Sequence, residues 1–181
     1  MVEKHVLYEV KGYVAVITLN RPKAKNACSS EMIKLWRECL EKAKADDNVR
    51  VIVVTGKGDT FCSGGDIRDM ADGKLKSWDM KRFLWDGVHR IVLTLEDLDK
   101  PVIAAINGAA MGAGMDMSIM CDLRVCSDRA KLAESYIMMG LIPGDGGAYF
   151  LPRLTGVSKA LELLLTGDVL TPEEALEMGI V

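Results

Sequence analysis

A glycine-rich turn with one acid behind it is the stretch of the sequence best suited to chemistry. Gly108, Gly112 and Gly114 follow a run of apolar residues, and Asp116 lies in the apolar segment that comes next. Glycine permits a tight turn and a close approach of the backbone. The first N–H groups of a helix starting here would have no partner within the helix, so they can stabilise a developing negative charge. Because an acid among apolar neighbours needs a reason to be buried, we expect Asp116 to be a functional residue; the alternative is a favourable charge in a first helical turn.

A second turn of the same kind occurs earlier in the chain, at Phe61-Cys-Ser-Gly-Gly-Asp66. Two turns that each lead from a strand into a helix can bring their free N–H groups to one oxygen atom. The alternative is that both are structural turns and nothing more. Neither turn matches the GxGxxG pattern of dinucleotide sites, and Gly56-Lys-Gly-Asp lacks the spacing of a P-loop. A nucleotide-binding fold is therefore poorly supported.

The apolar pattern predicts the strands and helices that hold these turns. Continuous apolar runs at 49–55 and 102–106 are typical of strands that are covered on both faces. Apolar residues at helical spacing predict an amphipathic helix over about 30–46 and a longer helix over about 78–98. Strands that alternate with helices indicate an α/β fold with parallel pairing.

Composition narrows the class of protein. The chain has 181 residues, a net charge of -3 and 49% hydrophobic residues, which is ordinary for one globular domain without a nucleic-acid partner. No apolar run approaches the roughly 20 residues that a membrane span needs, and the first residues do not resemble a signal peptide. Five cysteines without a CxxC pair favour reduced thiols, so we expect a cytoplasmic protein. Only two histidines are present, which leaves little material for a metal site or a serine–histidine triad.

A series of spaced motifs resembles the crotonase superfamily, also called the enoyl-CoA hydratase/isomerase family. The motifs occur in the family's order: Leu19-Asn-Arg-Pro with Asn26-Ala, Phe61-Cys-Ser-Gly-Gly-Asp-Ile67, Lys100-Pro-Val-Ile-Ala-Ala-Ile-Asn-Gly108, Gly112-Ala-Gly114 with Cys121-Asp122, Gly140-Leu-Ile-Pro-Gly, Leu151-Pro-Arg-Leu-Thr-Gly156 and Leu165-Thr-Gly-Asp. They cover nearly the whole chain. The resemblance implies an α/β spiral of repeated ββα units. Residues 1–181 would form one crotonase-like core domain, from which the family's C-terminal helical segment is missing.

The same resemblance implies an enzyme that acts on an acyl-CoA thioester, most simply an enoyl-CoA hydratase-like lyase. Coenzyme A would enter as part of the substrate, without a tightly bound cofactor, and the protein would assemble as a homotrimer or hexamer. Carried over by motif, the two N–H groups that stabilise the thioester enolate belong to Gly65 and Ala113. The alternatives are an isomerase or an acyl-CoA hydrolase of the same family, or a non-catalytic binding protein with this fold.

The acid–base groups depart from the family pattern. The family's hydratases use two glutamates to hold and deprotonate water; the first position is Asp116 here and the second falls on Tyr136. A phenol with an unperturbed pKa of about 10 is a poor base at neutral pH. Glu134 lies two residues away, and only a slip in the alignment would bring it into that position. Asp145 lies near a catalytic aspartate of some relatives, including a dehalogenase, although it could instead cap a helix. We expect Asp116 and Asp145 around the enolate carbon, with Tyr136 as a donor or positioning group.

The resemblance also places the nucleotide end of coenzyme A along two segments. These are the loop before the first helix, with Lys23 and Lys25, and the residues after the first glycine turn, Asp66, Ile67 and Arg68. For each basic residue the alternative is a solvated loop charge.

Overall fold

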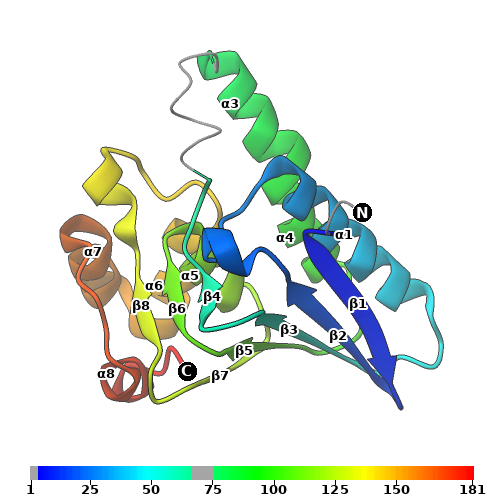
Figure 1. Cartoon of the computed structure of the whole chain (residues 1–181). Coiled ribbons are helices and arrows are strands. Elements are labelled where there is room, and N and C mark those ends of the chain that lie inside the picture. The colour runs from blue at the N-terminus through cyan, green and yellow to red at the C-terminus, as the bar shows by residue number, and fades with distance from the viewer. Residues whose placement is uncertain (1–3, 67–75) are drawn as a thin grey trace.

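The computed structural model describes residues 4–66 and 76–181. Two sheets lie side by side, with helices packed around them (Figure 1). Ile67 and Arg68, which we expected to contact coenzyme A, lie outside the described residues.

From β3 onwards, longer strands of one sheet alternate along the chain with shorter strands of a second sheet. The first sheet has the order β1-β2-β3-β5-β7, and the second has the order β4-β6-β8. β1 and β2 form an antiparallel hairpin, whereas the pairs from β2 to β7 and from β4 to β8 are parallel. The strands are β1 (Val6–Lys11), β2 (Val14–Leu19), β3 (Val51–Gly56), β4 (Thr60–Cys62), β5 (Val102–Ile106), β6 (Ala109–Met111), β7 (Leu123–Cys126) and β8 (Lys131–Ala133).

The first turn of the resulting spiral places β1 and β2 in the first sheet, and each later turn adds one strand to each sheet before it continues into helical structure, which confirms the predicted fold of repeated ββα units. The helical segments are η1 (Pro22–Ala24), α1 (Ser30–Ala45), α3 (Ser77–Phe83), η2 (Leu84–Val88), α4 (His89–Glu96), α5 (Ala113–Ile119), η3 (Ser135–Met139), α6 (Gly147–Thr155), α7 (Val157–Thr166) and α8 (Pro172–Glu177). The helix expected over about 78–98 is present, but the wider π turn of η2 interrupts it. None of the described helices is long and apolar enough to cross a membrane.

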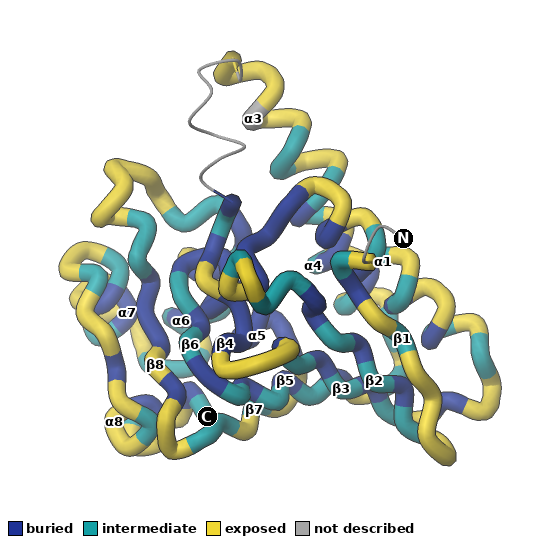
Figure 2. Tube along the Cα trace, in the orientation of Figure 1, coloured by how far each residue is buried: buried dark blue, intermediate teal, exposed yellow. Residues whose placement is uncertain are grey.

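Two helices show how the sequence positions the site. α1 begins at Ser29, whose hydroxyl accepts a hydrogen bond from the N–H of Met32, and it buries one apolar face against β1 and β2. α5 is different, because all seven of its residues are buried. It lies at the centre of the molecule, next to both sheets (Figures 1 and 2). A helix surrounded by protein carries Asp116 into the interior, away from bulk water.

Candidate active site

The two glycine-rich turns pack against each other. β4 and β6 are parallel neighbours, so the turns that follow them leave the sheet at the same edge. At Gly114 an added Cβ would lie 2.1 Å from the carbonyl oxygen of Cys62, a distance that no real contact allows. At Gly64, where φ is +104°, an added Cβ would lie 3.1 Å from the carbonyl oxygen of Met111. Each turn therefore needs glycine because the backbone of the other turn is so close.

The N–H groups expected to form the oxyanion hole belong to these adjacent turns. Cys28 donates its N–H to the carbonyl of Gly64 at 2.8 Å, and Asp66 donates its N–H to the carbonyl of Cys28 at 3.0 Å. Cys28 thus bonds to the carbonyl of Gly64 and to the N–H of Asp66, which lie on either side of Gly65. Because successive N–H groups point to opposite sides of an extended chain, the N–H of Gly65 points away from Cys28. Ala113 is the first residue of α5, so its N–H has no carbonyl partner within the helix. That both groups bind a thioester oxygen stays a prediction.

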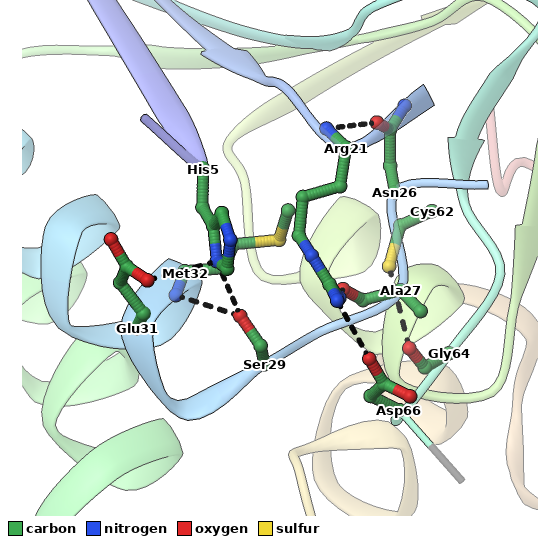
Figure 3. A network of polar contacts seen from close by, with 10 residues as sticks. All are labelled: His5, Arg21, Asn26, Ala27, Ser29, Glu31, Met32, Cys62, Gly64 and Asp66. Carbon is green, nitrogen blue, oxygen red and sulfur yellow. Dashed lines mark hydrogen bonds and ion pairs between the residues drawn. The ribbon is translucent and has the colours of Figure 1, made fainter. Parts of the chain in front are cut away.

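A buried ion pair fixes the turn that contains Gly65. Arg21 donates from Nη2 to Oδ2 of Asp66 at 2.8 Å and from Nη1 to the carbonyl of Ala27 at 2.5 Å (Figure 3). Its backbone N–H donates to Oδ1 of Asn26 at 2.8 Å. The carboxylate of Asp66 is 5% exposed and faces this guanidinium. Arg21 therefore ties the loop before α1 to the first glycine turn.

The lysines expected near coenzyme A lie on the surface of the same loop. Lys23 and Lys25 are exposed, and Nζ of Lys25 lies 3.0 Å from Oδ2 of Asp59. Their contact with coenzyme A, and that of Asp66, stays a prediction. Within residues 4–66 and 76–181, no group of three or more His, Cys, Asp or Glu side chains could hold a metal ion.

Three of the predicted catalytic side chains meet at the start of α5. The hydroxyl oxygen of Tyr136 lies 2.7 Å from Oδ2 of Asp116 and 2.9 Å from Oδ2 of Asp145. An added Cβ at Gly112 would lie 3.8 Å from the Tyr136 ring, so the phenol lies beside the N-terminus of α5. Capping is the wrong interpretation of Asp145, because Gly146 is the N-cap of α6 and no side chain caps the helix. Asp145 contacts Tyr136 instead.

Glu134 belongs to the same cluster, although the sequence interpretation left it out. Glu134 follows β8, is 1% exposed and lies beside Asp116. An added Cβ at Gly147 would lie 2.3 Å from Oδ1 of Asp116 and 2.7 Å from Oε1 of Glu134. The available signal was the position of this acid directly after Lys131-Leu-Ala133, the short segment that forms β8.

Burial governs the electrostatics of the cluster. Burial raises the pKa of Asp116 to about 6, although hydrogen bonds with Tyr136 and Glu134 oppose this change. Burial, together with the charge of Asp116, raises the pKa of Glu134 to about 10. The pKa of Asp145 is also raised by burial, while the hydrogen bond with Tyr136 and, less strongly, His89 act in the opposite direction. Burial and the neighbouring acids raise the pKa of Tyr136 further above its ordinary value, so the phenol keeps its proton. Acids whose pKa values are pushed apart are suited to giving and taking protons.

The ββα spiral and its two adjacent glycine turns are those expected of the crotonase superfamily. A family model described as enoyl-CoA hydratase/isomerase matches residues 9–181. The chain belongs to the enoyl-CoA hydratase/isomerase family.

Individual relatives agree with this assignment. The chain is 39% identical over 178 residues to the putative enoyl-CoA hydratase/isomerase YngF of Bacillus subtilis, covering 97% of this chain and 67% of that protein. It is 35% identical over 182 residues to 4-chlorobenzoyl coenzyme A dehalogenase-2 of an Arthrobacter species, covering 99% of this chain and 65% of the relative. The crystal structure of enoyl-CoA hydratase from Thermoplasma volcanium matches with a TM-score of 0.93 at 32% identity, covering 99% of this chain and 71% of that chain. The chain thus spans about two thirds of the length of these curated relatives.

Proposed function

We propose that the protein acts on an acyl-CoA thioester in an enoyl-CoA hydratase-like reaction. The observation that carries this proposal is the adjacency of two glycine turns with available N–H groups to a buried acid cluster. The N–H groups of Gly65 and Ala113 would stabilise the negative charge that develops on the thioester oxygen. Loss of one such donor costs about 3–4 kcal/mol of transition-state stabilisation in comparable sites.

Asp116 is the best-placed base for this reaction. As a carboxylate it would take a proton from water while the water oxygen bonds to the β-carbon of the enoyl group, and the electron pair of the double bond would move into the enolate. A protonated carboxyl would then return a proton to the α-carbon. A pKa of about 6 suits both halves of this cycle, since the group can hold either form near neutral pH. Asp145 is the second carboxyl, linked to Asp116 through Tyr136.

Isomerisation of the double bond is a second candidate, favoured by the Asp116–Tyr136–Asp145 chain. A double-bond shift removes a proton from one carbon and adds one to another, and it needs no activated water. A phenol between two carboxyls offers a path along which a proton can be passed.

Binding and assembly complete the proposal. Lys23, Lys25, Asp66, Ile67 and Arg68 would hold the nucleotide part of coenzyme A, which enters only as part of the substrate. Residues 1–181 would form a single core domain that assembles into homotrimers or hexamers. All five cysteines are free thiols, which supports a reducing compartment such as the cytoplasm.

A panel of coenzyme A thioesters, analysed by mass spectrometry after incubation with the protein, tests the reaction type. Crotonyl-CoA that gains the mass of one water indicates hydration, which is the expected result. An unchanged mass with a shifted absorption spectrum indicates isomerisation. Free coenzyme A indicates hydrolysis, and chloride released from 4-chlorobenzoyl-CoA indicates dehalogenation. No turnover and no binding of any thioester would overturn the proposal in favour of a non-catalytic protein.

A further inference from the structure

The hydrogen bonds of the acid cluster require more protons than its phenol can supply. The Tyr136 hydroxyl lies within hydrogen-bond distance of two carboxyls, Asp116 at 2.7 Å and Asp145 at 2.9 Å. A hydroxyl has one proton to donate, so it fully satisfies one of these contacts. The other contact needs a proton that comes from a carboxyl group.

The contact between Glu134 and Asp116 requires a further proton. Two ionised carboxylates can only accept hydrogen bonds, so they cannot bond to each other. With every acid ionised, Oδ1 of Asp116, both Oε atoms of Glu134 and Oδ1 of Asp145 are buried without a donor among the described residues. Buried oxygens without donors are strongly destabilising, and more so when they are charged. Some of these acids must therefore be protonated in the folded protein.

We propose that Glu134 is a positioning residue that keeps its proton and donates it to Oδ1 of Asp116, so that Asp116 is the single carboxylate of the cluster. Asp116 lies between two partners and can accept from both, from Tyr136 at Oδ2 and from Glu134 at Oδ1. Asp145, protonated, donates to the oxygen of Tyr136. This arrangement gives every contact one proton, and it leaves one negative charge in the centre of the cluster.

The environment of Glu134 agrees with a retained proton. The groups that interact electrostatically with Glu134 and its partners are Asp116 on α5, Tyr136 on η3 and Asp145 before α6. None of these three groups is a cation. His89 on α4 influences Asp145, and its Nε2 atom lies 2.8 Å from the carbonyl of Gly144. Burial and the charge of Asp116 together raise the pKa of Glu134 to about 10.

Two donors on opposite oxygens would fix the plane of the Asp116 carboxylate. Its position then depends on Glu134 as much as on Tyr136, although Glu134 need not touch the substrate. The structural part of this inference is independent of the reaction, and only its kinetic consequence rests on the proposed function.

A titration of the carboxyl groups in the absence of substrate tests directly whether Glu134 keeps its proton. The protein is labelled with glutamate carrying ¹³C at the side-chain carboxyl, and the resonance of Glu134 is identified by its loss in Glu134→Gln. We expect the chemical shift of a protonated acid at neutral pH, with titration only in the alkaline range. Titration near the ordinary glutamate value of about 4.3 would overturn the proposal. Glu96→Gln, at an exposed glutamate of α4, is the control and should leave the resonance of Glu134 in place.

Kinetics with crotonyl-CoA test the positioning role. Glu134→Leu removes the donor, and we expect kcat to fall about 10- to 100-fold, with KM changed by no more than about threefold. Glu134→Gln should recover most of the lost kcat, because an amide N–H can also donate to Asp116. It should also lack the decline of kcat at alkaline pH that ionisation of Glu134 causes in the unaltered protein.

The carboxyl titration and the kinetic experiment can contradict the proposal independently of each other. An unaltered kcat in Glu134→Leu, or equal losses in Leu and Gln variants that both fold, would remove the positioning role. Without turnover of crotonyl-CoA in the unaltered protein, the proposed hydratase activity fails, but the carboxyl titration still decides whether Glu134 holds the proton. Should neither variant fold, the titration of the unaltered protein still decides, because the proposal is overturned if every labelled glutamate titrates in the acidic range.

Discussion

Asp116 is the residue on which the proposed chemistry depends most. It has no exposed surface, and it accepts a hydrogen bond from Tyr136 at 2.7 Å. A base works in its deprotonated form, so activity should rise with pH as this carboxyl ionises. With a pKa of about 6, we expect kcat/KM to rise through pH 6 and then to stay level until the alkaline range.

The first prediction concerns the substitution Asp116→Asn, which keeps the size of the side chain but removes the base. We expect kcat to fall by at least about 100-fold, while the dissociation constant for an acyl-CoA changes by no more than about threefold. Steady-state kinetics and titration calorimetry measure these two quantities. Full activity in this variant would exclude Asp116 from the mechanism.

The second prediction concerns the pH dependence of stability in Glu134→Gln. The pKa of Glu134 is raised in the folded state, so between the unfolded and folded values the folded protein binds the extra proton. Its contribution to stability is complete below the unfolded pKa and is lost as pH rises towards about 10. The free energy of unfolding of the unaltered protein, relative to the variant, should therefore decrease with pH by at most about 1.4 kcal/mol per unit. Urea unfolding across the pH range measures it, and a pH-independent difference would contradict the prediction.

Some residues of the site could be predicted from the sequence, and others could not. Asp116, Tyr136 and Asp145 were expected together because motifs name them, and the structure brings their side chains within hydrogen-bond distance. Glu134 was not included, because its contact with α5 depends on how β8 packs, which no local pattern encodes. The helix-cap interpretation of Asp145 was reasonable locally, but it ignored a competing hydroxyl nine residues earlier in the chain.

At the level of elements, the start of α5 is held in place by the backbone of β4. The close approach of Gly114 to Cys62 leaves no room for a side chain. Sequence predicted this turn well, because glycine spacing and the apolar strand before it are local signals. It did not predict the π turn of η2, since apolar residues at helical spacing look the same whether or not one turn is widened.

The third prediction compares two glycine-to-alanine substitutions. Gly114→Ala forces backbone atoms apart, so we expect a loss of about 1–3 kcal/mol in the free energy of unfolding and a clear fall in kcat, because the N–H of Ala113 moves. Gly87→Ala is the control: its Cβ would lie 3.4 Å from a methyl group of Ile33, an ordinary contact. Urea unfolding and kinetics should show little loss there. Equal effects of both substitutions would contradict the close-packing explanation.

On the surface of the whole molecule, one of the regions with exposed apolar side chains lies around α7 and the end of η3. Their exposed fractions include 65% for Val157, 50% for Leu161, 67% for Leu165 and 74% for Met138. Large apolar patches often mark contact surfaces between proteins. This surface is consistent with the proposed assembly of identical chains, which the sequence resemblance predicted but which no local pattern in the chain could encode.

The fourth prediction is the mass of that assembly. Sedimentation equilibrium should give the mass of three or six chains, and raising the salt concentration should not dissociate them, because apolar contacts are not screened. Leu161→Asp should weaken the assembly, whereas Val10→Asp, at an exposed position of β1, should not. A monomer at micromolar concentration would contradict the prediction.

The crowding of acids around Gly147 has a consequence for the engineering of this protein. Buried acids with few donors destabilise a fold, and apolar residues of similar volume in their place often stabilise it. A library of variants selected only for heat resistance should therefore accumulate proteins of lower activity that are altered at Asp116 or Glu134. Selection for turnover would retain both acids together with the lower melting temperature that they impose.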